Sequence, residues 1–264
     1  MGSEMCIRDR VDEELLAINE DAQAFRLSEA YPILESMSQE AQRTLLYGGT
    51  SSVTPEQFPG LATRYNTTNR TIAQTAQNVI DAGGTGTDNT SIWVICWGDG
   101  KVSGIFPKNT MAGIQRKDFG LKTRDGVDEN GNPTIMAVYR EQFKWRLGLM
   151  AQDWRYAVRI ANIDVGDLNS GGENAPDIIT QLTKAFYRLP GAATTGGTMS
   201  KTCIYSNRTV LQFLDIERQK KAVGGTGISY KEVDGKTILQ WREMFPLRVV
   251  DQILNAESRV MNMA

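Results

Sequence analysis

Apolar residues recur at a helical spacing in the last third of the chain. Five of them share one face of a 3.6-residue period: Ile178, Leu182, Ala185, Phe186 and Leu189. Asn174 and Pro176 mark the start of this segment, and Pro190-Gly191 marks its end. We therefore predict an amphipathic helix between these signals.

A strand and a second helix are predicted next. Thr202–Tyr205 is a short β-type run, and Ser206-Asn207 suits the N-cap of a helix over Arg208–Lys221. Gly224-Gly225 would close that helix, because glycine readily adopts the left-handed conformation found at helix ends. The expected buried stripe of this helix is Val210, Phe213 and Leu214.

The chain then returns to β structure. Ile228–Val233 and Lys236–Trp241 flank Asp234-Gly235, a hairpin signal because a type I′ turn needs residues that tolerate positive φ. Phe245–Val250 is predicted as one more strand. Pro246 restricts that strand to a sheet edge or places the proline at a strand start, because proline has no backbone N–H.

The longest helical pattern lies near the start, from Asp12 to Tyr47. One apolar stripe precedes Pro32 and a second follows it: Leu15, Ile18, Ala22 and Phe25, then Ala30, Leu34, Met37, Ala41 and Leu45. Proline removes a backbone donor, so we predict a kink or restart near Pro32 and a straight second half. Gly48-Gly49 ends the helix.

Between these helical regions, Thr50 to Gly172 is predicted to be rich in strands. Ile92–Trp97 and Lys101–Phe106 flank Gly98-Asp99-Gly100, which indicates a short hairpin. Asn130-Gly131 indicates a second hairpin that leads into Thr134–Leu149.

Two runs in this region alternate with a period of two. Phe143, Trp145, Leu147 and Leu149 alternate with polar neighbours, and Trp154 to Ile160 repeats the pattern. The alternation predicts four basic side chains on one sheet face: Lys144, Arg146, Arg155 and Arg159. This face could contact DNA, the acidic residues of a neighbouring subunit, or water.

The composition narrows the function classes. The 264 residues are 41% hydrophobic, which is enough for a sizeable core, and a net charge of −2 disfavours a dedicated nucleic-acid binder. The absence of histidine removes Ser-His-Asp and Cys-His catalysis. No apolar stretch has the length needed to cross a bilayer. Cys6, Cys96 and Cys203 are too scattered for a disulfide framework or a metal site, so Cys96 and Cys203 are predicted as small core residues in strands.

Other chemical patterns are weak. Gly83–Thr87 lacks the lysine and helix of a phosphate cradle and is predicted as a flexible turn. The acidic group between Asp125 and Asn132 does not match the spacing of a calcium loop. The five tryptophans fall in predicted strands and could line a carbohydrate groove, although core positions are more usual: Trp93, Trp97, Trp145, Trp154 and Trp241. We predict no enzyme activity, no catalytic or metal-binding residues and no cofactor.

Seven stretches stand in an order that carries a resemblance: Tyr47–Gly49, Phe58–Tyr65, Asn78–Gly86, Asp153–Asp164, Asp177–Pro190, Thr202–Lys221 and Phe245–Asp251. Together they resemble the major capsid proteins of tailed phages, in particular the epsilon15-like podophage capsid proteins. The resemblance covers roughly Asp12 to Val260. None of the stretches is a chemical signature, so it rests on their joint presence and order.

The resemblance implies an α+β, HK97-like capsid fold. Residues 11–49 would form the spine helix, 50–172 a β-rich peripheral region with long hairpins, 173–244 an axial domain with a sheet flanked by helices, and 245–264 a returning strand. The implied function is a structural capsid protein whose pentamers and hexamers form an icosahedral shell around double-stranded DNA. The implied partners are copies of the chain, a scaffolding protein, a portal and packaged DNA, with assembly in the bacterial cytoplasm and no membrane.

Three further expectations accompany this interpretation. Residues 1–10 resemble spurious translation of sequencing-adapter DNA, and the resemblance implies that an N-terminal arm and an extended loop of the family are missing. Subunit contacts are expected on the outward face of the first helix, at Arg26, Glu29, Glu40 and Arg43, and at the tips Asp125–Pro133 and Gly191–Gly197. The alternative function is a carbohydrate-binding or tail-type β module of a phage particle.

Overall fold

The computed structural model describes residues 3–18, 21–49, 57–127, 131–170, 176–194, 201–220, 227–233 and 236–261. The chain divides into two compact units. Unit 1 comprises Met1–Ala41, Glu56–Phe58 and Ile105–Gly148, and unit 2 comprises Gln42–Pro55, Pro59–Gly104 and Leu149–Ala264. None of the helices in the described ranges has the length and apolar character of a membrane-spanning segment.

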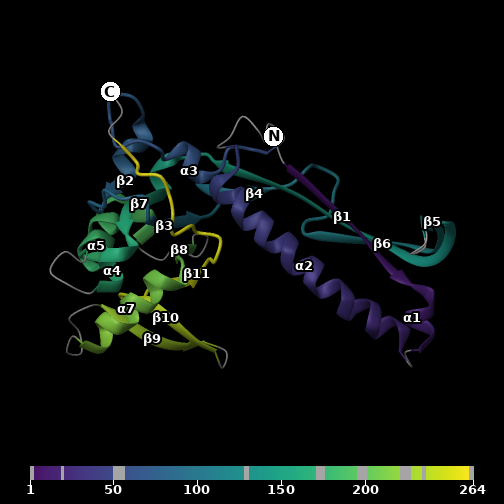
Figure 1. The fold of residues 1–264 in the computed structure, drawn as a ribbon. Coiled ribbons are helices and arrows are strands. Elements are labelled where there is room, and N and C mark those ends of the chain that lie inside the picture. The colour runs from purple at the N-terminus through teal and green to yellow at the C-terminus, as the bar shows by residue number, and fades with distance from the viewer. Residues whose placement is uncertain are drawn as a thin grey trace. The chain divides into compact units, whose positions relative to one another are not determined.

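Unit 1 is built on a three-stranded antiparallel arrangement (Figure 1). Strand β6 (Pro133–Ala151) lies between β1 (Ser3–Asp12) and β5 (Ile114–Val127). The pairing of β5 with β6 confirms the predicted second hairpin; residues 128–130 of its turn lie outside the described ranges. A bulge between Asp118 and Leu121 interrupts the register of β5.

Helix α2 (Ala22–Tyr47) begins in unit 1 and packs its buried face on this sheet. Ala30 and Met37 of the helix contact Phe143 of β6 in a buried apolar cluster. Half-buried apolar residues from the helix and all three strands surround them: Met5, Ile7, Ile33, Leu34, Ile114 and Trp145. The predicted alternation of β6 is therefore correct at Phe143 and Leu149, which are buried.

The helical start differs from the prediction. Residues 3–12 form β1, and a short helix α1 (Glu13–Ile18) precedes α2. The break lies before Ala22, where the Asp21 carboxylate accepts hydrogen bonds from the backbone N–H groups of Gln23 and Ala24, both at 3.0 Å. Helix α2 runs through Pro32 without a restart (Figure 1), because the proline is exposed and water can satisfy the carbonyl that loses its partner.

Unit 2 contains a mixed sheet in the order β2–β7–β3–β8–β11–β10–β9. Its strands are β2 (Val79–Asp81), β3 (Asn89–Trp97), β7 (Ala157–Asp164), β8 (Lys201–Ser206), β9 (Ile228–Val233), β10 (Lys236–Trp241) and β11 (Phe245–Val249). Strands β2 and β7 are parallel, as are β8 and β11, and the other pairs are antiparallel. The short strand β4 (Val102–Ile105) follows β3 after a turn and pairs with it at Trp97 and Val102.

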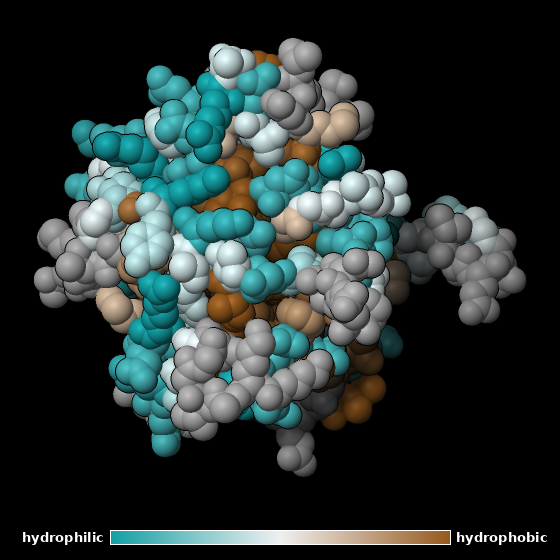
Figure 2. All heavy atoms as spheres, turned by 90° about the vertical axis from the view of Figure 1, so that its left-hand side faces the viewer, coloured by the Kyte–Doolittle hydropathy of each residue, from teal (hydrophilic) through white to brown (hydrophobic). Residues whose placement is uncertain are grey.

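Helices α5 (Ile178–Arg188) and α7 (Arg208–Lys220) supply apolar side chains to the core of this sheet. The shorter helices are α3 (Leu61–Arg64), α4 (Val165–Ser170) and α6 (Gly191–Thr194), with 3-10 turns η1 (Gln74–Asn78) and η2 (Trp154–Tyr156). Figure 2 shows the side that carries α5 and α7, where hydrophilic side chains cover most of the surface and apolar atoms are recessed between them. The two helices are therefore amphipathic, as their sequence pattern predicts.

The C-terminal predictions are largely confirmed. The Asn207 side chain caps α7 by accepting a hydrogen bond from the Val210 N–H at 3.0 Å. Strands β9 and β10 pair with the register of a two-residue hairpin, from Val233 opposite Lys236; Asp234-Gly235 itself lies outside the described residues. Pro246 is the second residue of β11, and this strand lies between β8 and β10, so the proline is near the strand start and the strand is not at a sheet edge.

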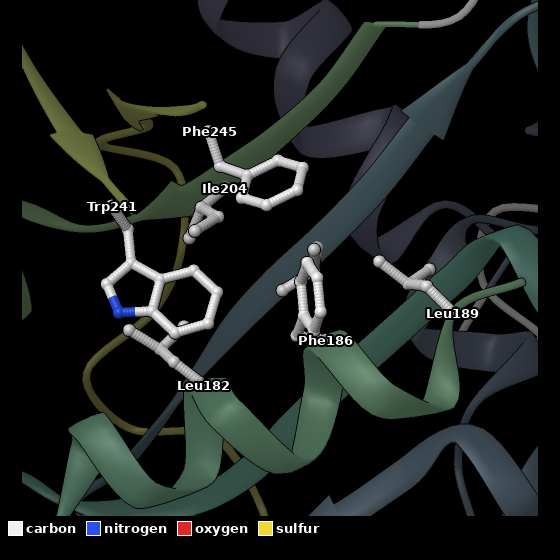
Figure 3. Close-up of a pocket in the computed structure, with 7 residues that line it drawn as sticks. Leu182, Phe186, Leu189, Ile204, Trp241 and Phe245 are labelled. Carbon is white, nitrogen blue, oxygen red and sulfur yellow. The ribbon is translucent and has the colours of Figure 1, made fainter. Parts of the chain in front are cut away.

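The core side chains of α5 meet those of the sheet closely (Figure 3). Leu182 and Phe186 of α5, and Leu189 directly after it, line a small space together with Ile204 of β8 and the aromatic rings of β10 and β11. The space they enclose is about 10 Å³ and is lined almost entirely by apolar atoms, so it offers an ordered water no set of hydrogen-bond partners. This part of unit 2 is a packed core and not a ligand cavity.

Two strand predictions are wrong. Gly98–Gly100 does not turn β3 back on itself, because β4 meets β3 only at the parallel pair Trp97–Val102 and both long edges of β3 are already occupied by β7 and β8. Trp154–Tyr156 is a 3-10 turn, and β7 after it is buried on both faces, so the alternation predicted from Trp154 to Ile160 does not hold.

The two compact units do not follow the predicted boundary between residues 172 and 173, because unit 2 contains residues from both sides of it. Strands β3 and β7, expected in the peripheral region, form the middle of the sheet that contains β8 and β11. The reason is pairing distant in sequence, since β3 bonds to β8 from Trp93–Tyr205 to Trp97–Lys201. Cys96 of β3 is fully buried and Cys203 of β8 is half-buried, in agreement with the prediction that both lie in strands.

Gly60 occupies a position in unit 2 where no side chain fits. A Cβ atom there would lie 2.6 Å from the Leu46 carbonyl oxygen and 2.7 Å from the Gly48 nitrogen. The Gly60 N–H donates a hydrogen bond to the Gly48 carbonyl at 2.7 Å. We expect Gly60→Ala to lower the free energy of unfolding by about 1–3 kcal/mol, because backbone atoms must move to admit the methyl group. Urea unfolding of the purified chain measures this loss.

Gly104→Ala is the matched control, because a Cβ atom at Gly104 meets nothing within 4 Å. Its unfolding free energy should stay within about 0.5 kcal/mol of the unsubstituted chain. Equal urea midpoints for the two variants would show that the close approach at Gly60 relaxes without cost.

Candidate functional site

A buried ion pair lies in unit 2 between strand β7 and the segment that follows β11. Arg159 and Glu257 have side chains that are 5% and 4% exposed, and the Arg159 Nη2 atom lies 2.9 Å from Glu257 Oε2. Arg159 also donates from Nη1 to the Tyr65 carbonyl at 2.8 Å and from Nε to the Ser91 hydroxyl at 3.1 Å. All three guanidinium nitrogens therefore have partners, which an arginine in a protein interior requires.

The carboxylate of this pair is equally well bonded. Ser91 and Tyr47 donate their hydroxyl hydrogens to its two oxygens, and the Glu257 N–H donates to the Asn89 carbonyl at 2.8 Å. Burial, followed by the nearby charge of Glu257, raises the pKa of Tyr47 above its usual value. A carboxylate that is 4% exposed and bonded to a guanidinium and two hydroxyls joins structural elements and is not accessible to a substrate.

The C-terminal segment is attached on both sides of Glu257. Asn162, at the end of β7, donates from Nδ2 to the Val260 carbonyl at 2.9 Å and accepts at Oδ1 from the Val260 N–H at 2.8 Å. Earlier in the segment, the Leu254 N–H donates to the Tyr47 hydroxyl at 3.1 Å. These contacts place residues 254–260 against the end of α2, β3 and β7.

A second charged cluster lies in unit 1. Glu141 of β6 is 2% exposed, and Arg116 donates to its two oxygens from Nε at 2.5 Å and Nη2 at 2.6 Å. Arg26 of α2 pairs with Glu141 as well, and with Asp118 at 2.8 Å. A hydrogen bond from the Gly120 N–H and the contact with Arg26 keep the pKa of Asp118 below its usual value. The cluster ties α2 to β5 and β6.

The sequence predicted Arg26 on the outward face of the helix, and this prediction is wrong. Its side chain is 11% exposed and lies over the Tyr139 ring at 5.1 Å. Among the other predicted contact residues, Glu29 and Arg43 are exposed and Glu40 is half-buried beside Gln57. Of the two predicted tips, residues 128–130 and 195–197 lie outside the described residues.

The four predicted basic residues do not share a sheet face. Lys144 and Arg146 of β6 pair with Glu4 of β1, at 2.7 Å and 2.9 Å. Arg155 is exposed in η2 and pairs with Asp153 at 2.7 Å, whereas Arg159 is the buried partner of Glu257. The prediction fails because β7 has two buried faces, so a charged residue there must point into protein.

The chemical patterns that the sequence singled out do not become reactive sites. The Gly83 N–H donates to the Asp81 carboxylate at 2.9 Å and the Gly84 N–H to the Asn162 carbonyl at 2.8 Å, so neither is free to bind a phosphate. Trp93 and Trp241 are buried in the core and cannot line a carbohydrate groove. Within the described residues, no group of three or more cysteine or acidic side chains is placed to hold a metal ion.

The comparisons with known proteins decide the family. The family model of major capsid protein GP7 matches residues 5–261. The chain belongs to the major capsid protein GP7 family. A near-atomic structure of bacteriophage epsilon15, obtained by electron cryomicroscopy and modelling, matches with a TM-score of 0.68 and 28% identity over 100% of this chain and 75% of that one. The search among curated proteins found no match.

Membership of the GP7 family confirms the predicted function of a structural capsid protein and the resemblance to epsilon15-like proteins. The fold is a mixed α/β one that matches a phage capsid structure. In a capsid protein, the ion pair of Arg159 and Glu257 has a structural role. Sequence reasoning missed it because the two residues are separated by 98 positions and no local pattern links them.

We expect Glu257→Gln to lower the free energy of unfolding by about 3–5 kcal/mol, because it leaves the Arg159 guanidinium buried without a counter-charge. Urea unfolding measures the loss. Asp251→Asn is the matched control, since it removes an equally close partner, 2.7 Å from Arg208, at the surface. Its urea midpoint should not change, because exposed pairs contribute little. Equal midpoints for the two variants would contradict a stabilising role for the buried pair.

The raised pKa of Tyr47 predicts that the stability of the fold decreases at alkaline pH. Because its pKa is raised in the folded state, the unfolded chain loses the hydroxyl proton first, above about pH 10, and stability falls as the pH rises. The stability advantage of the unsubstituted chain over Tyr47→Phe should thus be constant below about pH 10 and shrink above it. Urea unfolding between pH 8 and pH 11 tests this; a difference that stays constant across the range would rule it out.

Proposed function

We propose that this protein is the repeated subunit of an icosahedral, HK97-like shell that encloses the double-stranded DNA of a tailed phage. The observation that carries the proposal is the agreement of one family model and one phage structure over nearly the whole chain. Unit 1, with the start of α2 and the β5–β6 hairpin, would be the peripheral part, and the sheet of unit 2 would be the axial part.

The proposed partners follow from this role. Copies of the chain would form pentamers and hexamers in the bacterial cytoplasm, with a scaffolding protein and a portal directing closure. Symmetry multiplies each contact over the shell, so individual contacts can be modest and still hold the closed particle. Packaged DNA would meet the inner face without sequence-specific contacts, because the net charge is −2 and the four basic residues of the predicted sheet face, Lys144, Arg146, Arg155 and Arg159, are paired with acidic ones.

Light scattering combined with negative-stain imaging tests the proposal. Purified protein, alone and with a candidate scaffolding protein expressed beside it, should give rings or closed shells of uniform size. A monodisperse monomer under both conditions, at concentrations at which other capsid proteins assemble, would contradict it.

The exposed face of α2 supplies a more specific prediction. Glu29 and Arg43 are exposed, and we expect the double variant Glu29→Lys, Arg43→Glu to reduce the yield of particles roughly tenfold, because reversed charges repel the neighbour that the native charges attract. Glu232→Lys, at an exposed position in β9, is the control. Particle yield by sedimentation is the measurement, and an unchanged yield for the double variant would remove α2 from the contact surfaces.

A further inference from the structure

The three-stranded sheet of unit 1 has a second face, opposite the one on which α2 packs. On the helix side, Phe143 of β6 packs on α2, and Arg26 of α2 contacts Glu141 and Tyr139. Successive side chains of a strand point to opposite faces, so the even-numbered residues of β6 from Met136 to Arg146 lie on the second face. The register of β5 and β1 places the residues opposite them on that face as well.

Basic residues collect on this second face. We call it the basic face, after six residues of two neighbouring strands: Lys117, Lys122 and Arg124 of β5, and Arg140, Lys144 and Arg146 of β6. The acidic residues of the same two strands lie on the helix side: Asp118, Asp125 and Glu141. Strand β1 adds two basic and two acidic residues to the basic face: Arg8, Arg10, Glu4 and Asp12.

The basic face is therefore strongly charged in a chain that is nearly neutral. Its eight basic and two acidic residues give a net charge of +6, although the whole chain carries −2. The positive surplus comes from β5 and β6 and does not depend on residues 1–10. The overall charge of the chain thus conceals a separation of charge within unit 1.

Most of this positive charge has no counter-charge within the described residues. Lys144 and Arg146 share the single carboxylate of Glu4, at 2.7 Å and 2.9 Å. The other four basic residues form no ion pair with a described acidic residue, and the three of β5 are exposed. The Nε atom of Arg140 is buried and has no hydrogen-bond partner in the described part of the chain. Like charges on neighbouring strands repel one another, so an anionic partner over this face would stabilise the sheet.

The composition and length of the basic face suit DNA better than protein. The core of a protein–protein interface is depleted of charged residues and contains apolar ones, whereas protein–DNA interfaces are polar and strongly positive. Among the described residues of β5 and β6 on this face, only Met136 is an exposed large apolar side chain. Arg124 lies opposite Met136, and from there to Arg146 the strand extends over about 34 Å, about one turn of B-form DNA.

We propose that the basic face binds the phosphate backbone of double-stranded DNA. This inference rests on the proposed function, since a shell that encloses DNA exposes its subunits to a concentrated polyanion, and it assigns that contact to a defined surface. The lysine and arginine side chains would form charge-assisted hydrogen bonds with phosphate oxygens. Contacts to phosphates alone carry no sequence information, so the binding is independent of base sequence. The basic face would then line the inside of the shell.

Fluorescence anisotropy of the purified, unassembled chain with a labelled duplex of about 30 base pairs tests the proposal. Between about 50 and 200 mM salt, the logarithm of the affinity should fall against the logarithm of the salt concentration with a slope of about −4 to −5, because each of four to six phosphate contacts contributes about −0.9. The double variant Lys122→Gln, Arg124→Gln should reduce the steepness of this slope by about 2 and weaken binding about tenfold or more.

The matched control is Lys231→Gln, Arg248→Gln, which removes the same two charges from exposed positions of β9 and β11 in unit 2. Its slope and affinity should equal those of the unsubstituted chain. An unchanged slope for the β5 variant, or equal losses for the two variants, would overturn the assignment. If the β5 variant does not fold, Lys117→Gln is measured in its place. Its slope should be shallower by about 0.9, and an unchanged slope would overturn the assignment.

Competition distinguishes DNA from an acidic protein. Unlabelled duplex should displace the probe at a lower concentration of charge than poly-glutamate does, and equal displacement would overturn the choice of DNA in favour of an acidic protein surface. Shells formed by a chain without affinity for DNA would overturn this inference and leave the proposed function intact. DNA binding that depends on the basic face, in a chain that forms no shells, would contradict the proposed function and still support the assignment of the surface.

Discussion

The ion pair of Arg159 and Glu257 is the contact on which the arrangement of unit 2 most depends. It joins the middle of β7 to a segment 98 residues later, and through Ser91, Tyr47 and Tyr65 it includes β3, the end of α2 and the chain after α3. Buried charges are costly unless every polar atom has a partner. Here the partners come from five separate parts of the chain, so the pair is stable only when all of them are in place.

Unit 1 uses the same device on a smaller scale. Glu141 is buried under α2, and Arg26 and Arg116 reach it from the helix and from β5. An apolar cluster of Ala30, Met37 and Phe143 continues the contact along the helix. In both units an acidic residue thus sets the position of elements that apolar packing alone would allow to slide, because directional hydrogen bonds specify a register.

A capsid protein has particular use for such rigid units. The subunit must present the same surfaces in every copy, and contacts between copies are modest and repeated by symmetry. Buried charge networks keep each unit in one form, whereas the exposed residues of α2 and of the β5–β6 hairpin remain available for neighbours. The buried charge networks are therefore separate from the exposed residues of α2 and of the β5–β6 hairpin.

The sequence by itself determined the family and those local elements whose signals lie within a few residues. The stripe of Ile178, Leu182 and Ala185, the Asn207 cap and the spacing around Asp234-Gly235 act over a few residues, so their patterns can be read directly. Only the tertiary structure decided which strands are neighbours and which charges are buried. Arg159 has the sequence pattern of a surface residue, and it is buried because the chain at Tyr65 and the segment that carries Glu257 pack against its side chain, and this distant carboxylate compensates its charge.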